Sequence, residues 1–454
     1  MRNYDDIHKY FLLGEYIVLD VNSAAVHSVD EICYELVDDR DNEDVEKMME
    51  KYRDKFSKES IVETLSEISF LEKEGLLYSE AAVLPNAVHA GSIIKAMCLH
   101  VSHDCNLRCR YCFASQGDFH GTRKLMPVET GKKALKFLVE NSGSRINLEV
   151  DFFGGEPLMN FEAVKELVKY GRELEKEHNK NFRFTLTTNA TLLNDEITEY
   201  LNENMSNVVL SLDGRKNVND KMRGLGSYDV IVPNIQKFIE KRGDRDYYVR
   251  GTFTSENLDF GSDAKLFNEL GFKSVSIEPV VTDEKMSYAI RIEHLSEVLS
   301  EYERFAKEYV EIKKKNPDFN FFHFVIDLNQ GPCLIKRATG CGAGSEYLAV
   351  TPDGELFPCH QFVGESEMCL GTLDTGIVNK ELREKFQSSN VFTKEECRTC
   401  WARFYCSGGC HANSYYANQG DISKTYNIGC EMEKKRIECA IAIIVAKENG
   451  RDLL

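Results

Sequence analysis

The feature that most constrains this chain is a run of three cysteines, Cys105, Cys109 and Cys112, spaced C-x3-C-x2-C. Three thiolates on one loop suit a cubane of four irons and four sulfides in which one iron has no protein ligand. A structural zinc site would need a fourth ligand to close its tetrahedron, and the nearby residue that could serve is His120. Residues 95–102 predict a strand that leads into this loop. The run therefore predicts a cluster with one iron open to a small molecule.

Composition narrows the class of protein. The chain has 454 residues, enough for two to four domains, and fifteen cysteines. Its N-terminus lacks the apolar segment of a secretory signal, so we expect a cytoplasmic protein whose cysteines bind metal or catalyse rather than form disulfides. The longest apolar stretch, residues 439–446, is too short to span a bilayer. The formal net charge of −18 disfavours nucleic acid and anionic membranes as partners.

The chain divides into three regions by pattern: residues 1–85, 86–330 and 331–454. The first is a small mixed domain with two β-prone runs, a short third strand, and a capping box from Ser28 to Glu31. The second alternates strands and helices, which predicts parallel βαβ units of an α/β fold. The third holds most of the cysteines and is expected to be organised by metal.

Six candidate strands occur in the second region: 96–102, 147–153, 182–188, 208–212, 248–254 and 274–279. Six strands are too few for a closed eight-stranded barrel. We therefore expect a partial, TIM-like (β/α)6 barrel with its chemistry at the carboxyl ends of the strands. The distinctive short motifs of this region each follow a strand, as that rule requires.

The three cysteines, with Tyr111 before the last, resemble the signature of radical S-adenosylmethionine (SAM) enzymes. In that family, the Gly-Gly-Glu-Pro motif after the second strand binds the SAM amino group, although such a motif alone could be a tight turn. The resemblance implies further contacts with the ribose, carboxylate and adenine of SAM. Each of these residues could instead be an ordinary strand end, surface residue or core residue. The implied SAM residues are Gly154, Gly155, Glu156, Asn189, Ser211, Arg223, Tyr111 and Phe113.

The C-terminal region carries C-x12-G-x4-C, then C-x2-C-x5-C-x3-C, and a last cysteine. This pattern resembles the SPASM domain, which holds two auxiliary 4Fe–4S clusters, so that three clusters are implied in all. By resemblance, the outer cluster is ligated by Cys397, Cys400, Cys406 and Cys430, and the inner cluster by Cys341, Cys359 and Cys410. The fourth inner position is either open or filled by Cys333. The alternative is a zinc knuckle made by four of these cysteines, which would leave the other three without a partner set.

Residues 20–30 resemble the winged-helix recognition element of peptide-modifying enzymes, which implies that a leader peptide adds a strand to an exposed sheet edge. The alternative is a structural or dimerising domain. With residues 358–362, the whole chain resembles maturases of the six-cysteines-in-forty-five (SCIFF) peptides, a sactipeptide type. That resemblance implies a Cys-rich precursor peptide, thioether bonds from cysteine sulfur to threonine α-carbon, and a ferredoxin or flavodoxin as electron donor.

Two competing functions remain open from the sequence. Anaerobic sulfatase maturases oxidise Cys or Ser to formylglycine, but that family carries an aspartate directly after the second auxiliary cysteine, and this chain has His360 there. The other alternative is an iron–sulfur electron carrier without chemistry of its own. Formation of 5′-deoxyadenosine from SAM would separate the carrier from both enzymes.

Overall fold

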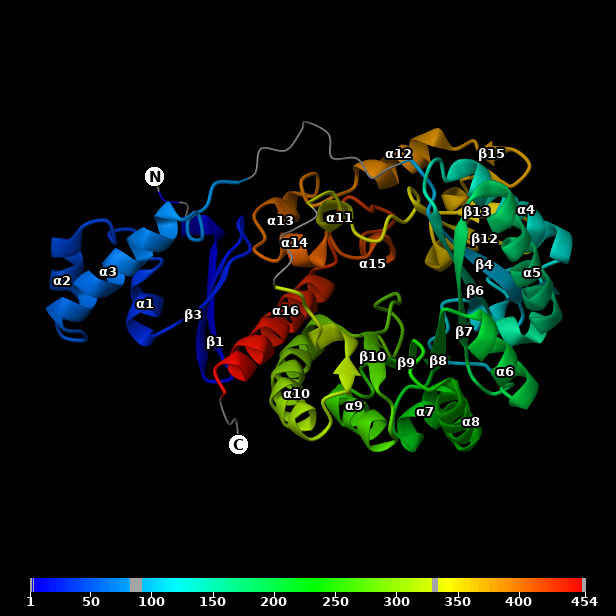
Figure 1. Cartoon of the computed structure of the whole chain (residues 1–454), viewed down its shortest axis with the longest axis horizontal. Helices are drawn as coiled ribbons and strands as arrows, with labels where there is room; N and C mark the ends of the chain where they lie inside the picture. Colours follow the sequence, from blue (N-terminus) through cyan, green and yellow to red (C-terminus); the bar gives the residue numbers. More distant parts are fainter. Residues whose placement is uncertain (1, 3, 82–91, 329–333, 451–454) are drawn as a thin grey trace.

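A computed structural model describes residues 2, 4–81, 92–328 and 334–450. Cys333 lies outside the described residues, so its expected place beside the inner cysteines stays a prediction. In Figure 1 the N-terminal sheet and helices lie at one end of the molecule and the strand–helix repeats at the other. The C-terminal segment runs between them.

The N-terminal region is a three-stranded antiparallel sheet, in the order β1-β2-β3, followed by three helices. Its elements are β1 (Ile7–Leu12), β2 (Glu15–Asp20), β3 (Val26–Val29), α1 (Glu31–Leu36), α2 (Val45–Tyr52) and α3 (Lys58–Lys73). The expected capping box at Ser28 is wrong, because strand β3 continues through Ser28, which pairs with Ile17. Helix α1 is capped instead by Asp30, whose side chain accepts from the amide of Cys33.

The central region confirms all six predicted strands. They are β4 (Ala96–His103), β6 (Asn147–Gly154), β7 (Asn181–Thr188), β8 (Asn207–Ser211), β9 (Tyr247–Phe253) and β10 (Ser274–Pro279), and each pairs in parallel with the next. Alternate residues along β6, β7 and β9 are buried and half-exposed. The buried set packs in the core, which leaves the other set for the concave face of a partial barrel.

Helices flank this sheet, as Figure 1 shows. They are α4 (Val128–Asn141), α5 (Phe161–His178), α6 (Asp195–Asn204), α7 (Lys216–Arg223), α8 (Ser227–Arg242), α9 (Phe260–Glu269) and α10 (Leu295–Lys315). Short 3-10 turns are η1 (Tyr4–Asp6), η2 (Ser115–Gly117), η3 (Pro157–Asn160), η4 (Ile292–His294), η5 (Phe322–Phe324), η6 (His360–Phe362) and η7 (Ser366–Met368).

The C-terminal region extends the same sheet, which its sequence pattern did not predict. Strand β12 (Tyr347–Val350) pairs in parallel with β4, and β13 (Glu355–Phe357), β14 (Gly371–Thr372) and β15 (Gly376–Ile377) follow antiparallel. At other positions β5 (Lys124–Leu125) pairs with β4, and β11 (Asn320–Phe321) pairs with β10. The cysteine-rich segment is therefore built directly onto the first barrel strand.

Six helices complete the C-terminal region: α11 (Leu334–Thr339), α12 (Lys380–Ser388), α13 (Glu395–Arg398), α14 (Arg403–Cys406), α15 (His411–Ala417) and α16 (Asn427–Glu448). The long helix α16 packs against α10 and also against β1 and β2. It thereby joins the barrel to the N-terminal sheet. Among the described helices, none is long and apolar enough to cross a bilayer.

The N-terminal sheet also docks on the loop that carries Cys400. The ring of His8 stacks on Trp401, with centroids 3.8 Å apart and planes 5° apart. The buried Arg403 donates to Asp6 and to Asn22, both at 2.9 Å. These contacts join residues nearly 400 positions apart and tie the N-terminal domain to the C-terminal cysteine loop.

Candidate functional site

Cys105, Cys109 and Cys112 follow β4 and line a cavity at the carboxyl ends of the barrel strands. The sulfur of Cys105 accepts from the amide of Leu107 at 3.4 Å and from Nδ2 of Asn189 at 3.7 Å. Hydrogen bonds of this kind to a ligand sulfur tune a bound cluster. Burial raises the pKa of Cys105 to about 11 and that of Cys109 to about 12. Without metal these thiols hold their protons, so metal binding must release them.

Gly154 and Gly155 let the end of β6 approach the cysteine loop. A Cβ on Gly154, whose φ is +128°, would lie 2.1 Å from the carbonyl oxygen of Ser102. A Cβ on Gly155 would lie 2.2 Å from the carbonyl oxygen of Asp104. We expected these glycines to make room for a ligand; the structure shows that they first make room for the chain segment leading into Cys105.

Glu156 is buried next to the two glycines, and its expected contact with SAM stays a prediction. Its side chain is 0% exposed. Its carboxylate accepts from the amide of Leu158 at 3.0 Å, the hydroxyl of Thr188 at 2.8 Å and the amide of Asn189 at 2.8 Å. These bonds join the ends of β6 and β7. The two glycines, not Glu156, present their backbone to the cavity.

The other expected SAM residues, Tyr111, Phe113, Asn189, Ser211 and Arg223, all line the same cavity. They differ in whether their side chains already form hydrogen bonds within the protein. Asn189 donates to Asn106 at 2.8 Å, so it holds the cysteine loop. Among the described residues, the hydroxyl of Ser211 has no protein hydrogen-bond partner, which leaves it available to a ligand.

Asp213 is the buried anchor of one wall. Its carboxylate accepts from the hydroxyl of Tyr111 at 2.8 and 2.9 Å and from Arg223 at 2.8 Å. Arg223 is thus paired within the protein, while its Nε is buried without a partner.

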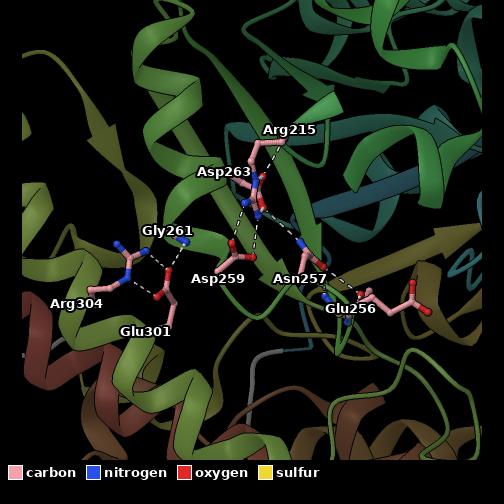
Figure 2. Close-up of polar contacts among 9 residues, drawn as sticks. Arg215, Glu256, Asn257, Asp259, Gly261, Asp263, Glu301 and Arg304 are labelled. Carbon is pink, nitrogen blue, oxygen red and sulfur yellow. Dashed lines mark hydrogen bonds and ion pairs between the residues drawn. The ribbon is translucent and has the colours of Figure 1, made fainter. Parts of the chain in front are cut away.

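A second polar network, on the side away from the cavity, links the loop after β8 to the start of α9 (Figure 2). Arg215 donates to Asp259 at 2.7 Å and to Asp263 at 2.7 Å, and these acids lie at the start of α9. Between Asp213 and Arg215, Gly214 has a φ of +132°, and a Cβ there would lie 2.3 Å from the Asp263 carboxyl group. The loop after β8 is therefore locked against α9.

The two expected cysteine groups stay a prediction, and the structure describes where seven of these cysteines lie. Cys397, Cys400, Cys406 and Cys430 line one cavity. Cys341, Cys359 and Cys410 lie within electrostatic range of one another. Within the described part of the chain, no three metal-ligating side chains converge on a point for a single ion.

Comparison with known families agrees with these donor sets. A model of the radical SAM superfamily matches residues 99–256, and a model of SPASM, an iron–sulfur cluster-binding domain, matches residues 341–401. The chain contains a radical SAM domain followed by a SPASM domain. Such domains bind iron–sulfur clusters and SAM, and the thiols and the cavity described above fit those groups.

Relatives and solved structures share this architecture. A cysteine-type anaerobic sulfatase-maturating enzyme of Clostridium perfringens is 24% identical, covering 77% of this chain and 96% of that protein. The radical SAM cyclopropyl synthase TigE of Paramaledivibacter caminithermalis is 22% identical, covering 77% and 73%. In fold, anSMEcpe with bound AdoMet matches at TM-score 0.62 and 22% identity, covering 78% and 99%. Streptococcus suis SuiB bound to S-adenosylmethionine matches at TM-score 0.52 and 18% identity, covering 90% and 95%.

The radical SAM cavity has a far wall that the sequence reasoning missed. Arg250 from the middle of β9 and Glu278 from the end of β10 line it together with His360 and Gln361 of the SPASM domain. Burial would raise the pKa of Glu278, but the neighbouring His323 and the Arg250 guanidinium lower it to about 2. Both residues lie in predicted strands, but strand membership alone does not say which side chains face inward.

His360 is a neutral group at this wall. Burial, with the charge of Arg250, lowers the pKa of His360 to about 3. Its ring contacts Phe113 and Phe153, with centroids 5.6 and 5.0 Å away. His360 thus joins the inner auxiliary cysteine Cys359 to the aromatic side of the SAM cavity.

Proposed function

We propose that this protein is a radical SAM maturase that joins cysteine sulfurs to threonine α-carbons in a Cys-rich precursor peptide. The observation that carries the proposal is the continuity of Cys359, His360 and Gln361. Cys359 belongs to the inner cysteine group, and the next two residues line the SAM cavity. A sulfur held at the inner group would lie beside the place where a radical is made.

The bound groups supply the hard step. If SAM and the clusters bind at the cysteines and the cavity described above, they would supply the radical chemistry that removes the α-hydrogen and an acceptor for the one electron released when the thiol loses its proton and its sulfur bonds to that carbon. The chain contributes positioning and exclusion of water. Phe113 and Phe153 line the cavity and, with Phe119 and His360, form an aromatic side that shields it. Ser211, whose hydroxyl lines the cavity without a hydrogen-bond partner among the described residues, would help to orient SAM.

The same proposal assigns residues 1–85 to the leader peptide, as a winged-helix-like recognition element. β3 is the outer strand of the N-terminal sheet, while the opposite edge strand, β1, packs against α16. The edge at Val26–Val29 is therefore the one at which a peptide can add a strand. Residues 86–330 form the radical SAM domain and 331–454 the SPASM domain in this assignment.

Coverage by known folds supports a function beyond that of the sulfatase maturases. The match to the anSMEcpe structures covers nearly all of those chains but only 78–79% of this one. The match to SuiB covers 90% of this chain. The unmatched share is about the size of the N-terminal domain. One anSMEcpe structure holds AdoMet together with a Kp18Cys peptide, which supports a peptide as substrate here.

Formylglycine formation is the second candidate, favoured by the similarity to the Clostridium perfringens enzyme over 77% of the chain. Against it stands the residue after Cys359. The sulfatase maturase family carries an aspartate at this position, and this chain carries His360. Its pKa of about 3 makes His360 a weak base. The cavity thus has a neutral side chain in place of the expected acid.

We further propose three four-iron clusters and an open iron in the inner one, which the substrate cysteine completes. Iron would lower the pKa of that thiol and hold its thiolate. Cys341 and Cys410 are exposed, while Cys359 is buried, so the inner group is accessible from one side. An experimental structure with a Cys333 sulfur about 2.3 Å from an inner iron, by analogy with zinc–thiolate bonds, would refute the open site.

The test uses anaerobically reconstituted protein with SAM, a reductant such as reduced ferredoxin or flavodoxin, and a Cys-rich precursor peptide. We expect 5′-deoxyadenosine and a peptide that loses two hydrogens per link and resists alkylation at the linked cysteines. An aldehyde that reacts with hydrazides would support formylglycine formation instead. If SAM is not cleaved under any of these conditions, the protein is an electron carrier and both enzymatic proposals fail.

A further inference from the structure

Lys394 is a buried cation beside the auxiliary cysteines. The residue is 1% exposed. Its ammonium group donates to the carbonyl oxygen of Gly408 at 2.9 Å and to the hydroxyl of Ser414 at 3.5 Å. Within the described residues, no carboxylate lies at ion-pair distance from it. A buried ammonium without a counter-charge is costly, so its partner must be sought among other groups.

The position of Lys394 identifies those groups. Its carbonyl accepts from the amide of Cys397, an outer ligand, at 3.2 Å. Its ammonium binds the segment at Gly408, between the outer ligand Cys406 and the inner ligand Cys410. The ionisable groups around it are the side chains of Cys397, Cys406, Cys430 and Cys410, which become anionic when they ligate a cluster. Lys394 therefore stands where the two auxiliary ligand sets meet.

We infer that Lys394 is the counter-cation of the auxiliary clusters and raises their reduction potentials, the outer one most. A four-iron cluster held by thiolates is anionic, and reduction adds one more negative charge. A fixed positive charge in a low-dielectric site stabilises the reduced form more than the oxidised form. Three of the four thiols that act on Lys394 belong to the outer set, which is why the outer cluster should respond most.

This inference deepens the proposed function, because thioether formation releases one electron to an auxiliary cluster. A raised potential makes the auxiliary clusters better acceptors than the SAM cluster. The inference about potential rests on the SPASM ligand sets alone. It can be tested without peptide, so its failure and the failure of the proposed reaction are distinguishable.

The experiment is a redox titration of the reconstituted holoenzyme, followed by electron paramagnetic resonance, on wild type and on Lys394→Gln, which is neutral but keeps a donor for Gly408. We expect the ratio of reduced to oxidised outer cluster to fall at least about tenfold at a fixed potential, or about 59 mV for one electron. The SAM cluster in the same sample should not move. Lys394→Arg should restore the potential, because it keeps the charge.

The matched control is Lys424→Met, which removes an exposed lysine of the same domain, and we expect a change below about twofold because solvent screens it. The inference would be overturned if the outer cluster of Lys394→Gln kept the wild-type reduction potential. It would also be overturned if Lys394→Arg lowered that potential as much as Lys394→Gln does. If Lys394→Gln fails to load its clusters, Ser414→Asp decides the matter. It keeps Lys394 but adds a carboxylate at its ammonium, and the potential should fall relative to Ser414→Asn; equal potentials in those two variants would refute the inference.

Discussion

Replacing Arg403 by methionine should release the N-terminal domain from the SPASM domain. The Arg403 side chain is 6% exposed and donates to Asp6 and Asn22, both at 2.9 Å, and to the carbonyl of Cys400 at 3.1 Å. Removing one member of a buried ion pair costs about 3–5 kcal/mol, because the other charge is left uncompensated. Asp6 keeps 17% exposure, so we take the lower end, about 3 kcal/mol.

A cost of about 3 kcal/mol corresponds to roughly a hundredfold increase in local opening, at 1.4 kcal/mol per factor of ten. Hydrogen exchange with mass spectrometry on the anaerobic holoenzyme measures that opening directly. The amides of β1 and of the segment from Cys397 to Cys410 should exchange faster. Amides of the barrel strands should be unaffected.

The matched control is Arg40→Met. Arg40 pairs with Asp5 at 2.8 Å, almost the same distance, but the two side chains are 74% and 83% exposed. Exposed pairs contribute about 0.2–1 kcal/mol, so exchange should rise at most about fivefold. Adding Asp6→Asn to Arg403→Met should recover part of the loss, because the unpaired charge is removed. Unchanged exchange of β1 in Arg403→Met would refute the docking argument, as would an equal effect of Arg40→Met.

Three further outcomes test the radical SAM site. Cys109→Ala should abolish 5′-deoxyadenosine formation, since two thiolates leave a labile cluster; a wild-type rate would contradict the cluster assignment. Gly155→Ala should lower the iron retained after desalting, because its Cβ would lie 2.2 Å from the Asp104 carbonyl oxygen, and full retention would count against that reasoning. Burial raises the pKa of Asp151 to about 6, so this group favours folding most below about pH 4, and that contribution disappears as the pH rises through 6. Melting curves of Asp151→Asn should show less of this decline; an identical pH dependence would argue against the raised pKa.

The docking contacts also affect how the leader-peptide assignment is tested. Deleting residues 1–85 would remove Asp6 and Asn22 from Arg403 and His8 from Trp401. A deletion would therefore disturb the outer cysteine loop as well as peptide binding. Proline at Val26, in the outer strand β3, removes an N–H that faces away from β2 and leaves those contacts in place, because bonded pairs alternate along the ladder from the Asp20–Ala25 hydrogen bond. We expect weaker peptide binding with SAM cleavage intact; unchanged peptide binding would refute the strand-addition proposal.

The sequence alone predicted the six barrel strands, and its resemblance to known motifs sorted the cysteines into groups that stay a prediction. Strand periodicity is local, so the pattern of apolar residues predicted β4, β6, β7, β8, β9 and β10 within one or two residues. Cysteine spacing is likewise a local signal, because three ligands on one loop must share one cluster. The four outer cysteines gather at one cavity as their spacing implied.

Only the tertiary structure decided which side chains face the cavity and which serve the protein itself. Glu156 is held inside the protein by three donors, one from the turn η3 and two from the end of β7, and Arg223 is paired with a buried Asp213. Neither outcome can be inferred from a motif, because each depends on groups brought together from distant parts of the chain. The same holds for Lys394 between the two cysteine sets and for Arg403 against Asp6. A charge becomes energetically significant when burial removes water from it, and burial is set by the packing of elements that are remote in sequence.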